Sequence, residues 1–225
     1  MPSRRRQIKP REIFQNRNLS LLWLGQVVSQ SGDSIYQIGL LWLVLELSGS
    51  EAVTGLVTMA SYLPAVLLSL PAGVVADRGD RRRVMLGSDA VRTMVVLMVP
   101  LLHLVGGLSP TLLAVDAFVL SIAATFFNPA RDALIPTIVP PSGLLNANSL
   151  VQSSWQFSLL IGPALAGLLL HLAGNVHLFT LDSLAYLSSF VCILLISSPR
   201  SLKPERKVFY QLCSLPFSAF LQFRS

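Results

Sequence analysis

Segment 73–83, GVVADRGDRRR, separates two apolar runs that are each long enough to cross a bilayer. Basic residues in so short a loop stay on the cytoplasmic face of a membrane, so the loop fixes the topology of the neighbouring runs. We expect Asp77 to pair with a neighbouring guanidinium or to cap the next helix, because a lone carboxylate is costly at the end of an apolar helix. Gly73, one turn earlier, is expected to let another helix approach closely. The basic residues of the loop are Arg78, Arg81, Arg82 and Arg83.

The composition supports an integral membrane protein. Of the 225 residues, 52% are hydrophobic and only 12% are charged, which is far more apolar than a soluble domain of this length needs. The net charge of +6 does not indicate nucleic-acid binding, because the basic residues lie between or outside the apolar runs. Cys192 and Cys213 form no spacing typical of a metal site or a disulfide framework. We predict no cofactor and no metal.

Six membrane-spanning helices are predicted between residues 18 and 198. Two prolines, Pro64 and Pro71, predict a kink in the second helix. The proline-rich stretch 128–143 predicts a break between the fourth and fifth helices. Residues 1–17 and 199–225 are expected to be basic cytoplasmic tails. The predicted helices cover about 19–47, 52–76, 84–105, 111–127, 145–172 and 176–196.

The positions of the cations test this topology, because a wrong span would scatter them over both faces of the membrane. All 17 lysines and arginines fall in the tails or the two predicted inner loops, except Arg92, which lies inside the third helix. None falls on an outer turn. The fold is therefore predicted to be an all-α integral membrane bundle of six helices with both termini in the cytoplasm.

The first helix carries a polar stripe. Its four polar residues are spaced four, three and four apart, which places them on one helical face: Gln26, Gln30, Asp33 and Gln37. A carboxylate near the middle of a span costs about 2.5 to 3.5 kcal/mol, so Asp33 should face a water-filled cavity or a partner. One interpretation makes the stripe a substrate and ion pathway. In the other, the glutamines join this helix to a neighbour and Asp33 pairs there.

The other charged residues within the spans are given structural interpretations. Asp89 and Arg92, three residues apart, are expected to form an intrahelical pair, or Arg92 snorkels to the membrane surface. Asp116 and Asp182 are expected to be solvated near outer helix ends. Residues 32–35, GDSI, imitate a serine-hydrolase motif, but no histidine lies at that depth, and no phosphate-binding Gly-Lys-Ser/Thr loop occurs. We predict no enzyme.

The order of Gly73, Asp77, Arg78, Arg81 and Arg82 resembles the loop between helices two and three of the major facilitator superfamily, written G-x-x-x-D-R-x-G-R-R. Asp80 replaces the second glycine of that pattern, as in a branch of bacterial exporters that includes the enterobactin exporter. Residues 128–136, NPARDALIP, resemble the loop before helix five in the same branch.

A second motif lies in the predicted fifth helix. Gly162, Pro163 and Gly167 resemble the core of the antiporter motif of the superfamily, G-x-x-x-G-P-x-x-G-G, with Ser158 and Ala166 in place of two glycines. A helix bent by proline and lined by small residues suits the place where the two halves of such a transporter meet. An ordinary helix contact through small residues is the alternative.

The resemblance implies a function. Members of the superfamily have twelve helices, bind substrate between two six-helix bundles and rock one bundle against the other. This chain would be the amino-terminal half, in a bacterial inner membrane, and Asp77 would help to lock the inner gate. The implied activity is ion-driven efflux, with the proton as coupling ion, of a small amphipathic or siderophore-like compound. The arginine that many drug exporters of the superfamily carry within helix four is absent.

The resemblance leaves the second bundle open. The residues after Arg206 do not resemble an inner linker, which suggests a truncated or frameshifted product. A split transporter or a homodimer would instead supply the second bundle from another chain. A third possibility is a fragment that binds partner helices without transporting. Without a second bundle, Asp77 and the Gly162–Gly167 face are expected to lack a partner.

Overall fold

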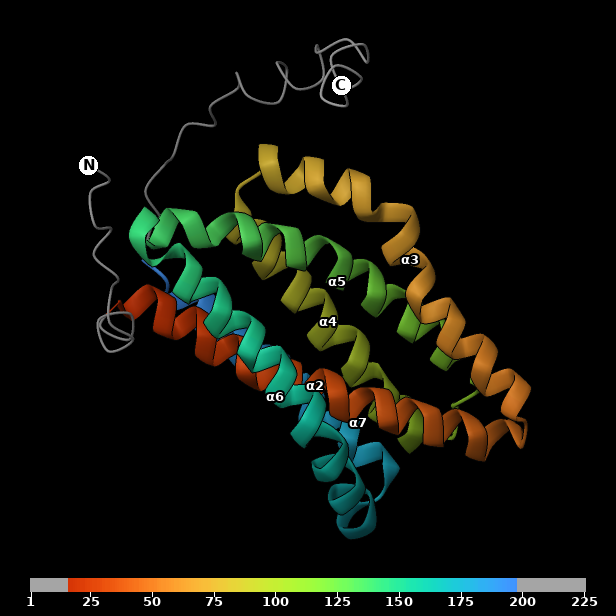
Figure 1. Ribbon diagram of the computed structural model, residues 1–225. Helices are drawn as coiled ribbons and strands as arrows, with labels where there is room; N and C mark the ends of the chain where they lie inside the picture. Colours follow the sequence, from red (N-terminus) through yellow and green to blue (C-terminus); the bar gives the residue numbers. More distant parts are fainter. Residues whose placement is uncertain (1–15, 198–225) are drawn as a thin grey trace, which may run out of the picture.

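The computed structural model describes residues 16–197 and shows an all-helical bundle, so the predicted all-α fold is confirmed (Figure 1). The predicted tails lie almost wholly outside the described residues. Within these residues the helices are α2 (Arg17–Ser48), α3 (Glu51–Arg78), α4 (Arg81–Leu104), α5 (Pro110–Ile138), α6 (Leu144–Ala173) and α7 (Asn175–Leu195), with a 3-10 turn, η1 (Pro141–Gly143), before α6.

The helices have the lengths and compositions of membrane spans. In the described part of the chain, α3, α4, α5, α6 and α7 are long and apolar enough to cross a membrane. Helix α2 is the longest, with 32 residues, and at 1.5 Å per residue it reaches roughly 48 Å, well beyond the hydrocarbon core. Helix α2 is not among the helices that are apolar enough to cross a membrane by composition alone. Amides and a carboxylate interrupt its apolar residues.

The two ends of the described chain meet at one end of the bundle. The side chain of Asn16 caps α2 and donates a hydrogen bond of 2.7 Å to the carbonyl of Ile138, at the end of α5. Asn18 accepts a 3.2 Å hydrogen bond from the backbone nitrogen of Ser197, just after α7. The chain therefore enters and leaves the bundle on the same side, as an even number of spans requires.

The prolines affect the helices differently. Helix α3 contains Pro64 and Pro71 and bends along its length (Figure 1). The predicted break at residue 128 is wrong, because α5 continues through Pro129 and Pro136 to Ile138. This continuation buries Leu134 and Ile135 almost completely. Burying two such side chains contributes about 3 to 6 kcal/mol, which offsets the lost helical hydrogen bonds.

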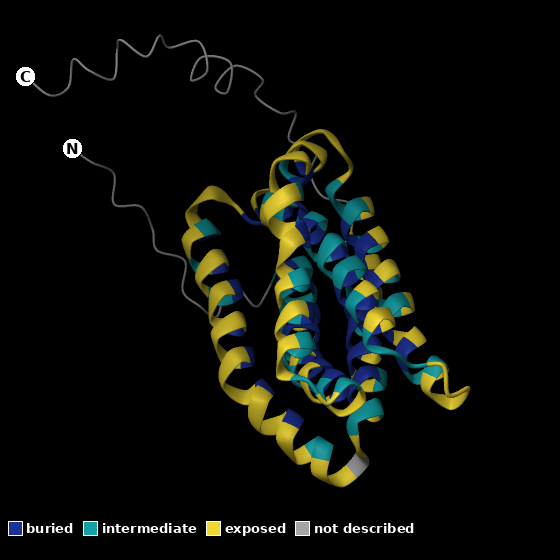
Figure 2. Ribbon diagram, turned by 90° about the vertical axis from the view of Figure 1, so that its right-hand side faces the viewer, coloured by how far each residue is buried: buried dark blue, intermediate teal, exposed yellow. Residues whose placement is uncertain are grey.

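The helices pack in the spatial order α6, α2, α7, α4, α5, α3. One apolar cluster lies at the end of the bundle that carries the arginine loop, and it includes Leu22, Met85 and Leu134. A second lies toward the opposite end and includes Leu40, Val96 and Leu113. Helix α6, at the left in Figure 2, turns mostly exposed residues away from the bundle.

Three glycines bring α2 close to α7. Gly25, Gly32 and Gly39 recur every seven residues and face α7. A Cβ at Gly25 would lie 3.2 Å from the Cβ of Cys192, and a Cβ at Gly32 would overlap the carboxylate of Asp182. The backbones of α2 and α7 therefore approach as closely as glycine permits.

Candidate functional site

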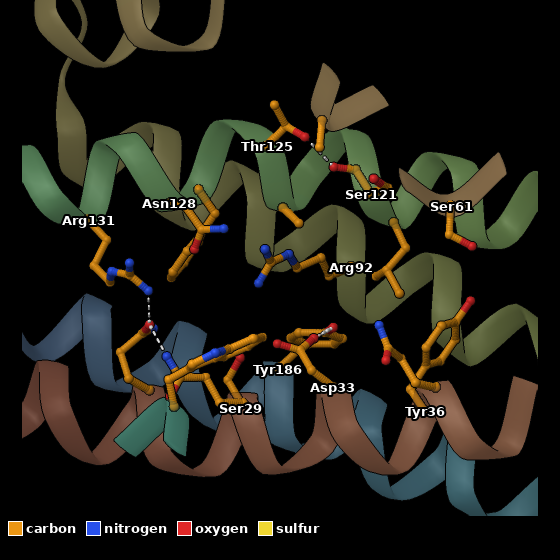
Figure 3. A pocket seen from close by; sticks show the side chains of 18 of the residues that line it. Ser29, Asp33, Tyr36, Ser61, Arg92, Ser121, Thr125, Asn128, Arg131 and Tyr186 are labelled. Atoms are coloured by element: carbon orange, nitrogen blue, oxygen red, sulfur yellow. Dashed lines mark hydrogen bonds between the residues drawn. The ribbon is translucent and has the colours of Figure 1, made fainter. Parts of the chain in front are cut away.

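A polar cavity of about 630 Å³ lies within the bundle (Figure 3). All six helices contribute to its wall, and α2 and α5 contribute most of it. The four residues of the predicted stripe all line this cavity, so the spacing in the sequence identified one continuous polar face. The polar and aromatic residues of the wall include Gln26, Gln30, Asp33, Tyr36, Gln37, Ser61, Tyr62, Arg92, Ser121, Thr125, Asn128, Arg131, Gln152, Trp155 and Tyr186.

Gln26 and Gln30, the first two residues of the stripe, also link helices. A guanidinium nitrogen of Arg131 donates a 3.1 Å hydrogen bond to Oε1 of Gln26, and Nε2 of Gln30 lies 3.4 Å from the same oxygen. The hydroxyl of Ser154 donates a 3.0 Å hydrogen bond to Oε1 of Gln30. This network connects α5, α2 and α6 at the end of the cavity nearest the arginine loop. The glutamines thus line the cavity and join helices, so the two interpretations of the stripe are compatible for these residues.

Asp33 lies near the middle of the cavity wall. The hydroxyl of Tyr186, on α7, donates a hydrogen bond to its carboxylate. Arg92 extends from α4 toward this pair (Figure 3). Asp33 therefore has both a hydrogen-bond donor and a nearby positive charge, and it keeps access to the cavity. These features offset part of the cost of a carboxylate at this depth.

Arg92 is buried rather than extended to a membrane surface. It is 3% exposed, and a guanidinium nitrogen lies 3.8 Å from the carboxylate of Asp89. Its guanidinium carbon lies 4.6 Å from the ring centre of Phe127 and 5.2 Å from that of Tyr186. The intrahelical pair is present, and the snorkelling alternative is wrong, because aromatic faces and carboxylates inside the bundle hold the charge.

Asp116 and Asp182 are buried, so the expectation that both are solvated is wrong. Asp116 is 9% exposed and accepts a 2.7 Å hydrogen bond from the hydroxyl of Tyr36. Asp182 is fully buried against Gly32. Both lie about two turns inside their helices, and the neighbouring helices cover them. The sequence shows how far a residue lies from a helix end, but not which helices pack over it.

In the arginine loop, Asp80 caps the next helix rather than Asp77. The carboxylate of Asp80 accepts hydrogen bonds of 3.1 and 3.3 Å from the backbone nitrogens of Arg82 and Arg83. Asp77 is exposed and has no hydrogen bond or ion pair with any described residue. The expected capping or pairing of Asp77 is therefore wrong for this conformation, because Asp80 is the residue that directly precedes α4.

Two further residues of the loop motif have clear surroundings. Arg82 donates hydrogen bonds of 3.1 and 2.6 Å to the carbonyls of Ile193 and Leu194, at the end of α7, where a cation also suits the helix dipole. A Cβ at Gly73 would meet open space, so no described helix approaches it. Arg78 lies exposed in the last turn of α3, and Arg81 is partly buried at the start of α4.

The residues of the proline-containing motif lie on two different faces of α6. Gly162 is buried against Ser34 of α2, and Ala166 is also buried. Pro163 and Gly167 are exposed, and a Cβ at Gly167 would meet open space. The expectation that this whole face lacks a partner is wrong: the face through Gly162 packs on α2, because its small residues admit that helix closely.

Sequence reasoning missed the aromatic residues of the cavity. Tyr62 on α3 and Trp155 on α6 line it and are 58% and 41% exposed. Tyr186 was missed as the partner of Asp33. Of these residues, only Tyr36 could have been predicted from the sequence, because it lies three residues after Asp33 on the polar face of the same helix. The positions of the other three depend on how the helices pack.

Comparison with known families decides the assignment. The sequence profile of a family described as transmembrane secretion effector matches residues 10–223. The chain belongs to this family of the major facilitator superfamily. It is a multi-pass membrane protein of a transporter family rather than an enzyme family.

Individual relatives agree with the family. The multidrug efflux pump Tap of Mycolicibacterium fortuitum is 29% identical over 196 residues, which cover 84% of this chain and 48% of that protein. Macrolide efflux protein A of Streptococcus pyogenes is 25% identical over 80% of the chain and 44% of its own length. The MFS-type transporter YvqJ of Bacillus subtilis is 29% identical over 80% of the chain and 43% of its own length. The chain thus spans less than half the length of these relatives.

Proposed function

We propose that this chain forms the amino-terminal bundle of a secondary active efflux transporter in a bacterial plasma membrane. The observation that supports the proposal is the cavity, to whose wall α2 contributes the polar stripe Gln26, Gln30, Asp33 and Gln37. Polar residues at this depth are costly, and in membrane proteins they mark substrate or ion pathways. The relatives named as efflux pumps support the direction of transport.

The cavity suits an amphipathic substrate. Tyr62 and Trp155 offer exposed aromatic surface, while the hydroxyls and amides of the wall offer hydrogen bonds. Arg92 already occupies the ring faces of Phe127 and Tyr186. We therefore infer that a substrate ring stacks on Tyr62 or Trp155 and that polar groups of the substrate meet α2 and α5. The names of the relatives support a macrolide or a similar drug as substrate. The enterobactin-exporter branch and a siderophore-like substrate stay predictions.

We assign the coupling role to Asp33. It is the carboxylate of the stripe, it lines the cavity, and it has a hydrogen-bond donor that stabilises its ionised form. A proton that binds to Asp33 would cancel its charge and weaken the hold on a cationic or hydrogen-bonding substrate. The proton is thus the proposed coupling ion, and the reciprocal effect of substrate and proton on Asp33 would couple their movements.

A second bundle is needed for alternating access. The surfaces available to it include the exposed sides of α3 and α6, with Pro163, Gly167 and Asp77, which has no partner in the described part of the chain. We propose that Asp77 closes the inner gate against that bundle, together with Gly73, Arg78 and Arg81 at the same end. More of the same polypeptide, a separate chain or a second copy would each supply that bundle.

Export from cells tests the proposal. Cells that produce the chain are loaded with a fluorescent macrolide, and efflux is compared for wild type, Asp33→Asn and Asp77→Asn at matched membrane levels. Glu51→Gln, on the outer turn, is the charge-neutralising control. With a second copy of the chain as the other bundle, we expect efflux that a protonophore abolishes, that both test variants lose and that the control keeps. Efflux equal to empty vector, with the chain inserted, would favour the second candidate function, a membrane protein that binds partner helices without transporting alone.

A further inference from the structure

Asp182 is a buried acid that the proposed substrate pathway does not use. It lies on α7, behind the cavity wall, and it is fully buried. Neither carboxylate oxygen has a hydrogen-bond partner among the described residues. Its carboxylate lies against Gly32 of α2, where any larger residue would collide with it. The close approach of α2 and α7 therefore seals this carboxyl group from water.

Asp182 has no hydrogen-bond donor and no ion pair among the described residues. The charged and titratable groups that influence it electrostatically come from four helices: Asp33 and Tyr36 on α2, Arg92 on α4, Asp116 on α5 and Tyr186 on α7. Arg92 is the cation of this set, and its closest carboxylate is Asp89, at 3.8 Å. Asp116 has the hydroxyl of Tyr36, and Asp33 has that of Tyr186.

Such a carboxyl group cannot stay ionised at low cost. An isolated carboxylate in a dry interior is strongly disfavoured, and it takes up a proton instead. When two neighbouring acids differ in their surroundings, the proton resides on the acid with fewer donors and less water. Asp182 is fully buried and has no donor among the described residues, whereas Asp33 has both Tyr186 and the cavity.

We propose that Asp182 carries a proton in this conformation and that Asp182 and Asp33 form the proton-carrying pair of the exporter, with Tyr186 between them. This pairing rests on the proposed function, and it makes Asp182 the store from which Asp33 is protonated. Tyr186 follows Asp182 by four residues on α7, so both side chains lie on one helical face.

The proton transfer from Asp182 to Asp33 needs no reactant other than Tyr186. Once a movement of the helices brings the carboxyl group of Asp182 within hydrogen-bond reach of Tyr186, the hydroxyl of Tyr186 gives its proton to the carboxylate of Asp33, and its O–H bond forms again with the proton that leaves Asp182. Asp33 becomes neutral and Asp182 becomes charged. The charge on Asp182 then needs water, so the transfer requires α2 and α7 to separate at Gly32. The proton step is thereby tied to a movement of helices.

Infrared spectroscopy of the purified full chain in lipid nanodiscs tests where the proton resides. Labelling with carbon-13 aspartate shifts the carbonyl band of protonated aspartates and thereby identifies it. At neutral pH we expect the wild type to show such a band and Asp182→Asn to lose a component that Asp33→Asn and Asp116→Asn keep. A wild type without any protonated aspartate band would overturn the proposal with no variant needed. So would an unchanged band in Asp182→Asn.

Export by the same variants then tests the pairing. The amide of Asp182→Asn resembles a protonated acid, so we expect normal insertion and macrolide binding but at least a tenfold loss of proton-driven efflux. Wild-type efflux in this variant, together with a proton on Asp182, would show that the proton is structural and that the pairing is wrong. The infrared result needs neither substrate nor transport, so it stands even if the chain does not export drugs by itself.

Discussion

Arg92 places a guanidinium between the two apolar clusters of the bundle. It is 3% exposed, and it is stabilised by Asp89, by the nearby charge of Asp33 and by two aromatic rings. Each ring contact contributes about 0.5 to 2 kcal/mol when it is shielded from water. The residue therefore holds α4 to α7 and α5 by electrostatics in a layer where apolar packing is interrupted.

Removing this charge should be costly. We expect Arg92→Leu to lower the free energy of unfolding by about 3 to 5 kcal/mol, because Asp89 is then left buried and unpaired. The double variant Arg92→Leu/Asp89→Leu should regain much of that loss, since an apolar pair of similar size leaves no buried charge. Denaturant unfolding in detergent measures both. A double variant that is as unstable as the single one would contradict the ion pair as the main interaction.

A second prediction at the residue scale concerns the start of α4. Asp80→Ala should cost about 1 kcal/mol, because two backbone nitrogens lose their acceptor. Asp77→Ala is the matched control, and it should leave stability unchanged since Asp77 is unpaired among the described residues. Thermal unfolding followed by circular dichroism compares the two. Equal losses, or a larger loss for Asp77→Ala, would show that the capping assignment is wrong.

The residues of the site differ in how far the sequence could predict them. The stripe through Asp33 was predictable, because helical spacing alone places its members on one face. Asp182 and Tyr186 were not, since their importance depends on which part of α2 covers them. The heptad spacing of Gly25, Gly32 and Gly39 was a visible signal for that contact.

At the scale of the element, hydropathy and turn residues predicted six helices between residues 18 and 198, and six helices are found in the described range. The end of α5 was missed because local rules weigh the prolines, whereas the burial of Leu134 and Ile135 is a tertiary effect. The packing of α6 was half predictable: its small residues indicated a close contact, but not that α2 makes it.

The contact of α6 with α2 gives the prediction at this scale. We expect Gly162→Ala to destabilise the bundle by about 1 to 3 kcal/mol, because the new methyl group would overlap the side chain of Ser34. Gly167→Ala, one turn and one residue further on the same helix, meets open space and should be neutral or slightly stabilising. The difference in melting temperature between the two variants is the measurement. Equal melting temperatures would contradict the α2–α6 contact.

At the scale of the whole molecule, we expect the arginine loop and both chain ends to lie in the cytoplasm. After replacement of Cys192 and Cys213 by serine, single cysteines are introduced at Ser50 and Ser109, on turns of one end, and at Arg83, on the other. A membrane-impermeant maleimide should label the first two in intact cells and the third only after permeabilisation. Labelling of Arg83→Cys in intact cells would invert the topology.

The central claim is that the polar cavity binds the transported compound. The most direct test is the equilibrium binding of a fluorescent macrolide to the purified chain in nanodiscs, with wild type compared against Gln37→Leu and Trp155→Ala in the cavity. Asn148→Leu, on the outward face of α6, is the control. We predict saturable binding that each cavity variant weakens about tenfold, or about 1.4 kcal/mol, and that the control keeps. Binding that is unaffected by the cavity variants, or weakened only by the control, would contradict the account.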